Sequence, residues 1–242
     1  MASGVSRWLT ATVARVAPAT PHGRILLLDV PGWPGNRPGQ HLDVRLTAED
    51  GYQAERSYSI ASSGDGETVE LAVDELPDGE VSPYLVEDVQ PGDQLEVRGP
   101  IGAYFVWRET QDEPVQLIAG GSGVVPLVAI ARARLASGNR SPFRMLYSVR
   151  SPEDAFYAAE LAAIDDPGFR VDWAYTRHAP EAWPHPLGRV TPESVARDTI
   201  PAADDPLVYV CGPTGFVEAV SHILVDLGHA PGRIKTERFG GA

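Results

Sequence analysis

The sequence predicts two domains of different class, an antiparallel Greek-key β-barrel followed by a Rossmann-like parallel α/β sandwich. Up to about residue 107, short β-like runs alternate with turns rich in Gly, Pro and Asp. After residue 114, apolar strands alternate with longer helical segments. The polar stretch at 109–114 separates the two patterns, so we expect domains at 1–110 and 111–242.

In the first half, the evenly spaced runs are typical of a small barrel with few free edges. Only one short helix is expected among them, near residues 81–87. The strands are expected at residues 8–16, 24–30, 40–46, 55–61, 68–74, 94–97 and 102–106.

In the second half, alternating strands and helices predict a parallel sheet that is covered on both faces. The strands are expected at residues 115–119, 144–149, 170–175, 207–211 and 233–239. The helices are expected from the glycine-rich turn at 120–123 to about 135, at 152–164, from 191, and at 214–227.

Composition excludes several classes of function. The 242 residues are 43% hydrophobic, which matches a globular protein, and no window approaches the roughly 18 apolar residues of a membrane span. With 33 acids against 20 bases, the net charge of -13 argues against nucleic acid as a partner. The first seven residues lack a cationic segment followed by an apolar run, so no signal peptide and a cytoplasmic location are expected.

Cysteine content limits the redox chemistry. Cys211 is the only cysteine, so this chain can form no internal disulfide. It also cannot supply the roughly four thiolates of an iron-sulfur cluster. No metal site is expected. Any electrons moved here would be carried by an organic cofactor.

A glycine-rich turn, Gly120-Gly121-Ser122-Gly123, follows a buried strand and opens a helix. Such a turn lets the backbone approach a phosphate, and the helix start offers free N–H groups. It departs from GxGxxG because Pro126 stands at the third glycine, and tight strand-to-helix packing alone would also favour glycine. A hydrolase elbow at Ser122 is disfavoured, since Val124 stands where that motif needs glycine.

A second cluster lies in the first half. Arg56-Ser57-Tyr58-Ser59 ends a strand, and Gly79 to Ser82 opens the short helix. An arginine, hydroxyl groups and a helix start would together suit a pyrophosphate, and the tyrosine offers a flat face to a ring. Each of these residues taken singly also has an ordinary structural explanation.

Seven motifs in order give the chain, from about residue 5, a resemblance to the ferredoxin-NADP reductase superfamily. They are Pro38-Gly39-Gln40-His41, Arg56-Ser57-Tyr58-Ser59, Gly79-x-x-Ser82, Gly99-Pro100-x-Gly102, Gly120-Gly121-Ser122-Gly123-x-x-Pro126, Val210-Cys211-Gly212-Pro213 and Glu237-Arg238-Phe239. The resemblance implies an FAD-dependent oxidoreductase in which hydride passes from NAD(P)H to FAD, whose electrons then go to an acceptor.

For FAD, the resemblance implies that Arg56 pairs with the pyrophosphate, Tyr58 lies against the isoalloxazine or ribityl chain, and Ser59 bonds near flavin N5. His41 is expected to touch the flavin or, equally, to have a packing or surface role. Asp74 stands where relatives often carry a base. The remaining expected FAD contacts are Ser57, Ala72, Val73, Gly79, Val81 and Ser82.

For the nicotinamide dinucleotide, the resemblance implies a turn formed by Gly121, Ser122, Gly123 and Val124. It places Cys211, with Gly212, Pro213 and Thr214, beside the nicotinamide, in a positioning role rather than covalent attack. A small apolar residue that ends a buried strand is the alternative for Cys211. Glu237 and Phe239 are expected near the flavin, and the expected catalytic residues are Ser59, Cys211 and Glu237.

Tyr175-Thr176-Arg177 bears on the choice of nicotinamide. No acid stands there to bind a free 2′-hydroxyl, and NADPH-using relatives have a hydroxyl residue followed by arginine. Arg150, after the preceding strand, is expected to add to the same pocket, although both arginines could simply be solvated loop residues. NADPH is therefore the expected donor, with NADH possible.

Three possibilities for the acceptor stay open. The first is a separate carrier such as a ferredoxin, a cytochrome or an oxygenase component, although the net charge of -13 opposes steering of an acidic ferredoxin unless arginines cluster locally. The second is a diaphorase or flavin/ferric reductase with a small-molecule acceptor. The third is a flavin-binding interaction module without turnover.

Overall fold

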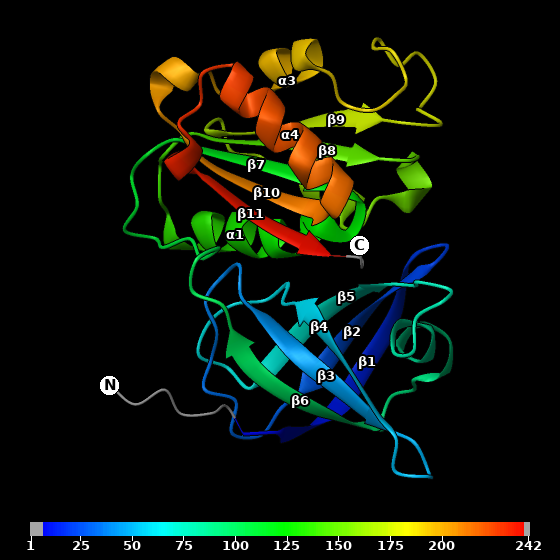
Figure 1. Cartoon of the computed structure of the whole chain (residues 1–242). Coiled ribbons are helices and arrows are strands. Elements are labelled where there is room, and N and C mark those ends of the chain that lie inside the picture. Colours follow the sequence, from blue (N-terminus) through cyan, green and yellow to red (C-terminus); the bar gives the residue numbers. More distant parts are fainter. Residues whose placement is uncertain (1–6, 240–242) are drawn as a thin grey trace. The chain divides into compact units, whose positions relative to one another are not determined.

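The structure is a computed structural model that describes residues 7–239 (Figure 1). Residues 1–6, which carry most of the signal-peptide argument, lie outside the described residues. The chain divides into two compact units between Trp107 and Arg108, and each unit has its own sheet. Among the described residues, no helix has both the length and the apolar character needed to cross a lipid bilayer.

The first unit is an antiparallel sheet of six strands in the order β4-β3-β6-β1-β2-β5. The ends of this order meet just beyond β4, where Ile60 bridges Leu71 and the Ala61 N–H donates to the Glu70 carbonyl at 2.8 Å. This closure makes the expected Greek-key barrel. The strands are β1 (Leu9–Thr20), β2 (Gly23–Asp29), β3 (His41–Thr47), β4 (Gln53–Ser59), β5 (Thr68–Asp74) and β6 (Gln94–Ile101).

Alternation along the strands builds the barrel core. On β3, Leu42 and Val44 are fully buried, while Asp43 between them points to the opposite face. A single π-helical turn, η1 (Tyr84–Asp88), adds Leu85 and Val86 to the same core. The short helix expected near residues 81–87 is therefore present, with helical residues at 82–88.

The strand expected at 102–106 is wrong. β6 ends at Ile101, and Gly102 follows it in the left-handed region at φ +98°. Phe105, Val106 and Trp107 are nevertheless buried, in a segment without regular secondary structure. Their apolar side chains therefore reflect burial and not a strand.

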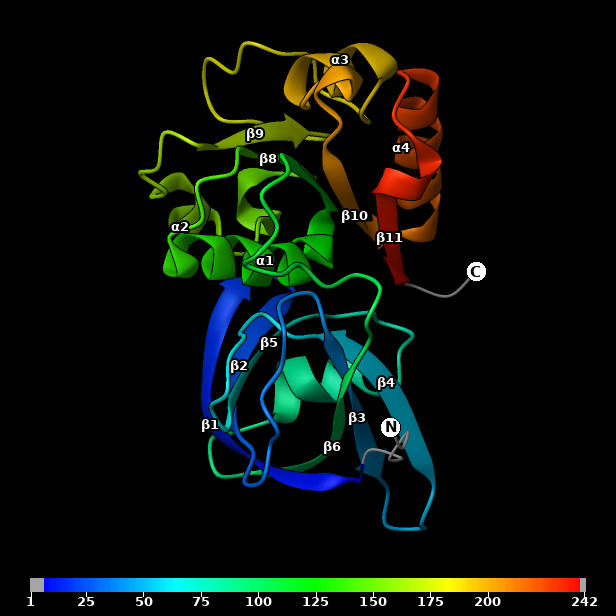
Figure 2. The ribbon, with the colours of Figure 1, turned by 90° about the vertical axis from the view of Figure 1, so that its left-hand side faces the viewer.

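The second unit is a parallel sheet of five strands in the order β11-β10-β7-β8-β9. In Figure 2, α1 (Val124–Ser137) and α2 (Ala158–Ala162) lie on one face, and α3 (Pro192–Asp198) and α4 (Thr214–Asp226) lie on the other. The expected α/β sandwich is therefore present. Its strands are β7 (Val115–Gly120), β8 (Phe143–Val149), β9 (Phe169–Tyr175), β10 (Leu207–Pro213) and β11 (Ile234–Phe239).

The prediction of a long helix at 152–164 is wrong. The segment forms a 3₁₀ turn at Pro152–Asp154 and then only α2, because Tyr157 between them adopts a left-handed φ of +59°. Phe156 is 1% exposed, and its N–H donates to the Tyr147 hydroxyl at 3.1 Å. This tertiary contact replaces the local hydrogen bond that a continuous helix would need.

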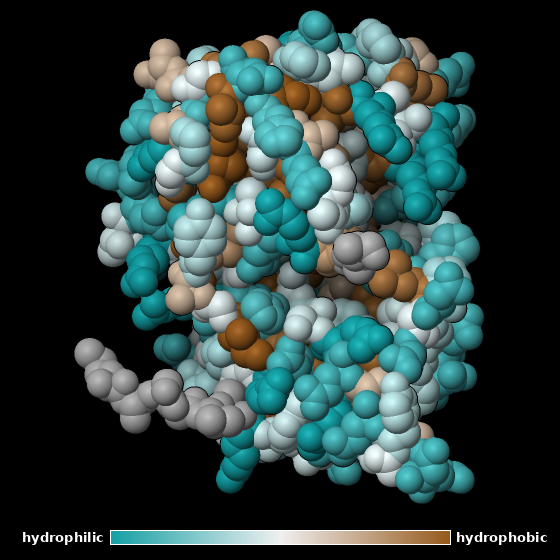
Figure 3. Space-filling model, viewed as in Figure 1, coloured by the Kyte–Doolittle hydropathy of each residue, from teal (hydrophilic) through white to brown (hydrophobic). Residues whose placement is uncertain are grey.

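Most of the surface in Figure 3 is hydrophilic, with smaller hydrophobic patches among it. Scattered apolar side chains are normal on a folded protein. This polar surface agrees with the acidic composition. No broad apolar patch is seen in this view.

Candidate functional site

Strand β4 carries the first group of predicted site residues. Arg56 and Tyr58 are paired with Val44 and Leu42, so they lie on the same face of the sheet as these core residues. Tyr58 packs against the core, and burial raises the pKa of its hydroxyl far above the ordinary value. The guanidinium of Arg56 stays half exposed. β4 therefore presents a fixed ring and an accessible positive charge side by side.

The second motif meets this strand through Glu80. Arg56 Nη2 lies 2.8 Å from Glu80 Oε2, which joins residues 24 positions apart. The Tyr52 hydroxyl donates to the other carboxylate oxygen at 2.7 Å. These hydrogen bonds, from Tyr52 and then from Arg56, lower the pKa of Glu80. Sequence reasoning placed the two motifs together but missed Glu80 and Tyr52.

The loop before η1 has little side-chain freedom. A Cβ at Gly79 would lie 2.9 Å from the Leu76 carbonyl oxygen, so a larger residue would not fit. Val81 is fully buried, and the Ser82 hydroxyl accepts a hydrogen bond from the Leu76 N–H at 3.0 Å. These two side chains serve the fold, which leaves the main chain of the loop to contact a ligand.

Other predicted residues of this unit lie elsewhere. Ser57 donates to Asp43 at 2.6 Å, and Arg98 binds the same carboxylate at 2.7 Å, so Ser57 belongs to a network on the opposite face from Arg56. His41 and Ser59 are paired on that face, and burial lowers the pKa of His41. On β5, the side chains of Ala72 and Val73 are buried, whereas that of Asp74 is exposed.

The order of the second sheet creates a switch point between β7 and β10. From β7 the chain adds β8 and β9 on one side and then returns to place β10 on the other. In open sheets of this kind, ligands bind outside the carboxyl ends of the strands at the switch point. The turn Gly121–Gly123 lies there, between β7 and α1, beside the end of β10.

Glycines make this junction possible. A Cβ at Gly123 would collide with the Cys211 carbonyl, so the turn packs directly on the end of β10. A Cβ at Gly120 or Gly212 would lie 2.7 or 2.8 Å from the Phe216 ring, which sequence reasoning missed. Gly121 differs, because its φ is +55° and nothing lies within 4 Å of its Cβ position.

Cys211 and Glu237 are partners across β10 and β11, and Pro213 and Phe239 form the next pair but one. The thiol is 1% exposed, so burial, reinforced by the Glu237 carboxylate, raises its pKa well above the ordinary value. Burial also raises the pKa of Glu237 to about 7. Thr214 begins α4 immediately after this strand.

Arg150, Thr176 and Arg177 meet at the carboxyl ends of β8 and β9. The Arg177 N–H donates to the Arg150 carbonyl at 2.9 Å, and the Thr176 N–H donates to Val149 at 2.9 Å. Both arginines are exposed, and within residues 7–239 neither guanidinium forms an ion pair. An acid is also near: Glu153 has a pKa lowered mainly by Ser151 and, more weakly, by His178.

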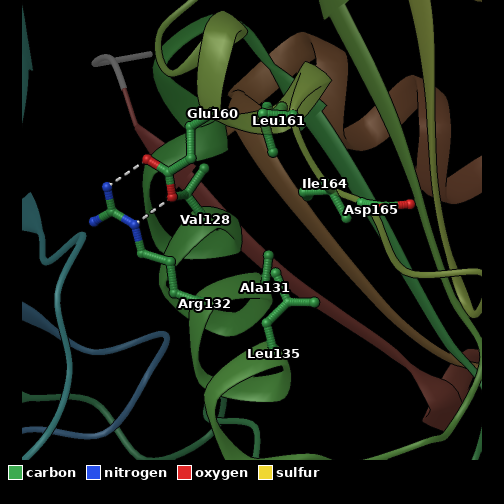
Figure 4. A pocket seen from close by; sticks show the side chains of 9 residues that line it. Val128, Ala131, Arg132, Leu135, Glu160, Leu161, Ile164 and Asp165 are labelled. Atoms are coloured by element: carbon green, nitrogen blue, oxygen red, sulfur yellow. Dashed lines mark hydrogen bonds and ion pairs between the residues drawn. The ribbon is translucent and has the colours of Figure 1, made fainter.

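A separate pocket of about 320 Å³ lies between α1 and α2 (Figure 4). Arg132 and Glu160 form a bidentate salt bridge at one side of the pocket, with Nε–Oε1 and Nη2–Oε2 distances of 2.6 and 2.7 Å. None of the predicted site residues lines this pocket. Its apolar lining is formed by Val128, Ala131, Leu135, Leu161, Ala163 and Ile164.

Two family models match the chain in order. The model of the oxidoreductase FAD-binding domain matches residues 25–106, and that of the oxidoreductase NAD-binding domain matches residues 117–222. The first match contains the strand with Arg56 and Tyr58. The second contains the glycine turn and Cys211.

The curated relatives are reductases by name. NADH-cytochrome b5 reductase 1 of Aspergillus oryzae is 31% identical over 206 residues, covering 81% of this chain and 69% of the relative. The reductase component of the naphthalene 1,2-dioxygenase/salicylate 5-hydroxylase systems of Ralstonia sp is 29% identical over 204 residues, covering 84% of this chain. The chain spans only 60% of the length of that second relative.

Solved structures agree over almost the whole chain. The flavohem-like FAD/NAD binding domain of nitric oxide dioxygenase from Vibrio cholerae superposes with a TM-score of 0.85 at 28% identity, covering 96% of this chain and 99% of that one. A cytochrome P450 reductase from Amycolatopsis gives a TM-score of 0.82 at 30% identity, covering 96% of this chain and 70% of that one.

Proposed function

Because the chain belongs to the ferredoxin-NADP reductase superfamily, we propose that it oxidises NADPH through FAD and delivers the electrons to a separate acceptor. Bound FAD would supply a flavin ring that takes up a hydride and can release electrons singly. The protein's own contribution is to bind, orient and shield the two dinucleotides.

The barrel unit fits FAD. Arg56 offers an exposed guanidinium for the diphosphate, the type of group that arginine binds best. Gly79 keeps a close-packed loop free of a side chain next to that charge. Tyr58 is held by the core at the same face and would support the ring system. Ser59 and His41 are paired on the other face at the ends of their strands, where they would contact the flavin only at its edge.

The second unit fits a nicotinamide dinucleotide. The open space at Gly121 and the start of the 14-residue helix α1 would accept its pyrophosphate on backbone N–H groups. Cys211, Gly212, Pro213 and Thr214 would flank the nicotinamide. Since burial keeps the Cys211 thiol protonated, its role would be to shape the pocket rather than to attack. Glu237 beside it would hold a proton near neutral pH.

NADPH is favoured because two exposed arginines, Arg150 and Arg177, flank Thr176 at the end of the sheet. Guanidinium groups suit a 2′-phosphate, whereas NADH needs no positive charge there. We propose a carrier protein as the acceptor, since the relatives include the reductase component of a dioxygenase system and a cytochrome b5 reductase. The observation that best supports the proposal as a whole is the Gly121–Gly123 turn at the switch point, packed on Cys211.

The test is an anaerobic visible spectrum of the FAD-loaded protein, recorded while NADPH or NADH is added to parallel samples. Bleaching of the flavin band, faster with NADPH at low concentration, is the expected result. A protein that takes up no FAD would refute the proposal for the barrel. Equal rates with both donors would remove the NADPH preference alone.

The acceptor is tested on the same reduced protein. Single-electron transfer to an added ferredoxin or cytochrome should be saturable and salt-dependent. Efficient turnover with free flavin or ferric chelates, and none with carrier proteins, would instead identify a small-molecule reductase.

A further inference from the structure

Arg56, on which the proposed FAD site depends, is already bound to a carboxylate of its own chain. Its Nη2 lies 2.8 Å from Glu80 Oε2, while Tyr52 donates to Glu80 Oε1 at 2.7 Å. Both oxygens of the carboxylate are therefore engaged, one by the guanidinium and one by a phenol. In this arrangement Glu80 satisfies Arg56 in the way that a phosphate group would.

This contact lies at the surface. The side chains of Arg56 and Glu80 are 50% and 47% exposed, and Tyr52 is 57% exposed. Exposed ion pairs of this kind contribute little to stability, because water solvates both partners well when they separate. A diphosphate offers more negative oxygens in a geometry that suits a guanidinium, so it can compete with Glu80.

We propose that Glu80 is an internal competitor of FAD: without FAD its carboxylate occupies the place on Arg56 that the diphosphate takes, and it must leave when FAD binds. This inference rests on the proposed function. Glu80 would thereby set how tightly and how quickly the chain takes up its cofactor, and Tyr52 would hold the carboxylate in its competing position.

The structure has room for the exchange. Glu80 lines a pocket of about 520 Å³ together with Tyr52, Ala54 and Tyr84. A carboxylate that leaves Arg56 can turn into this pocket while it keeps the Tyr52 hydroxyl. It then remains a negative charge close to the bound diphosphate, and the repulsion lowers the affinity for FAD below what Arg56 alone would give.

Glu80 also stands apart from its neighbours in what it does for the fold. Gly79 and Val81 on either side are required by close packing and by the barrel core. In contrast, within residues 7–239 the Glu80 side chain accepts hydrogen bonds only from Tyr52 and Arg56, which are both exposed. Its replacement by the isosteric amide should therefore leave the barrel intact.

The experiment is a titration of the FAD-free protein with FAD, followed by quenching of flavin fluorescence. Glu80→Gln should lower Kd by about two- to tenfold, with most of the change in the association rate. Tyr52→Phe should change Kd in the same direction by less. Glu160→Gln is the matched control, since Glu160 is 42% exposed and pairs with Arg132 in the second unit, away from this pocket. It should leave Kd unchanged.

Arg56→Ala separates this inference from the proposed function. It should weaken FAD binding and abolish the gain from Glu80→Gln in the double variant, because the competitor then has nothing to compete for. If Arg56→Ala leaves FAD binding unchanged, the proposed FAD site is wrong. If Arg56→Ala weakens binding while Glu80→Gln binds no more tightly than the wild type, Glu80 is not a competitor.

Discussion

Cys211 and Glu237 are partners on adjacent parallel strands, and burial raises the pKa of both. The two groups nevertheless differ in protonation near neutral pH, because the ordinary pKa of a thiol is much higher than that of a carboxyl group. The thiol stays protonated through the neutral range, whereas the carboxyl group, with a pKa of about 7, exchanges its proton within it. Glu237 is thus the group at the end of β11 that can hold or release a proton under working conditions.

The first prediction concerns stability and pH. The pKa of Glu237 is about 7 in the folded chain and 4.5 ordinarily, so the folded form binds more protons between these values and loses stability as pH rises across them. Relative to wild type, Glu237→Gln should gain about 2 to 3 kcal/mol of unfolding free energy between pH 5 and pH 8. Urea unfolding at several pH values measures this difference.

Glu218→Gln provides the control for this experiment, since Glu218 is exposed on α4. Its stability curve should run parallel to that of the wild type. If the Glu237→Gln curve also runs parallel to the wild-type curve, the carboxyl group does not titrate in the neutral range.

Sequence reasoning worked best where the pattern is local. Strand β7 is a fully buried run that ends in glycine, and Thr191 with Pro192 marks the start of α3 by capping chemistry. It failed at 152–164, where the burial of Phe156 and its bond to Tyr147 outweigh helix propensity. It failed at 102–106 because a buried irregular chain has the same apolar content as a strand.

For the candidate sites, motifs identified the residues but not their partners. Arg56 and Gly79 stand out in the sequence, yet nothing local indicates that Glu80 binds Arg56 or that Phe216 covers Gly120 and Gly212. These contacts depend on tertiary folding. The adjacent Ser57 shows the same limit, since strand alternation turns it toward Asp43 and away from the face of Arg56.

The second prediction concerns Cys211→Ala. If the thiol shapes the nicotinamide pocket, the substitution should slow reduction of bound FAD by NADPH roughly tenfold while FAD affinity stays unchanged. The cost in stability should be about 1 kcal/mol, because only one buried atom is removed. Stopped-flow absorbance measures the rate. Cys211→Ser should recover part of it, and a wild-type rate in Cys211→Ala would exclude the positioning role.

The third prediction concerns Gly123→Ala. The added Cβ would collide with the Cys211 carbonyl, so the turn or the end of β10 must shift. We expect a loss of about 1 to 3 kcal/mol in stability and a clear rise in the KM for NADPH. Thermal unfolding and steady-state kinetics measure the two effects. Gly232→Ala, which has open space and no left-handed φ, should change neither, and unchanged kinetics in Gly123→Ala would place the dinucleotide elsewhere.

The fourth prediction concerns the choice of nicotinamide. Arg177 lies at the carboxyl end of β9 beside Arg150, and neither guanidinium is engaged in an ion pair within residues 7–239, so both are available for a 2′-phosphate. Arg177→Ala should raise the KM for NADPH by roughly ten- to a hundredfold, since a charge-assisted hydrogen bond contributes about 1.5 to 3 kcal/mol. The KM for NADH should change little, because NADH has no phosphate at that position.

Arg140→Ala controls for the loss of one positive charge, since Arg140 is exposed and precedes the amino end of β8, opposite to Arg177. An equal effect of Arg177→Ala on both donors would mean that Arg177 acts on the shared part of the dinucleotide, and the preference for NADPH would lose its structural basis.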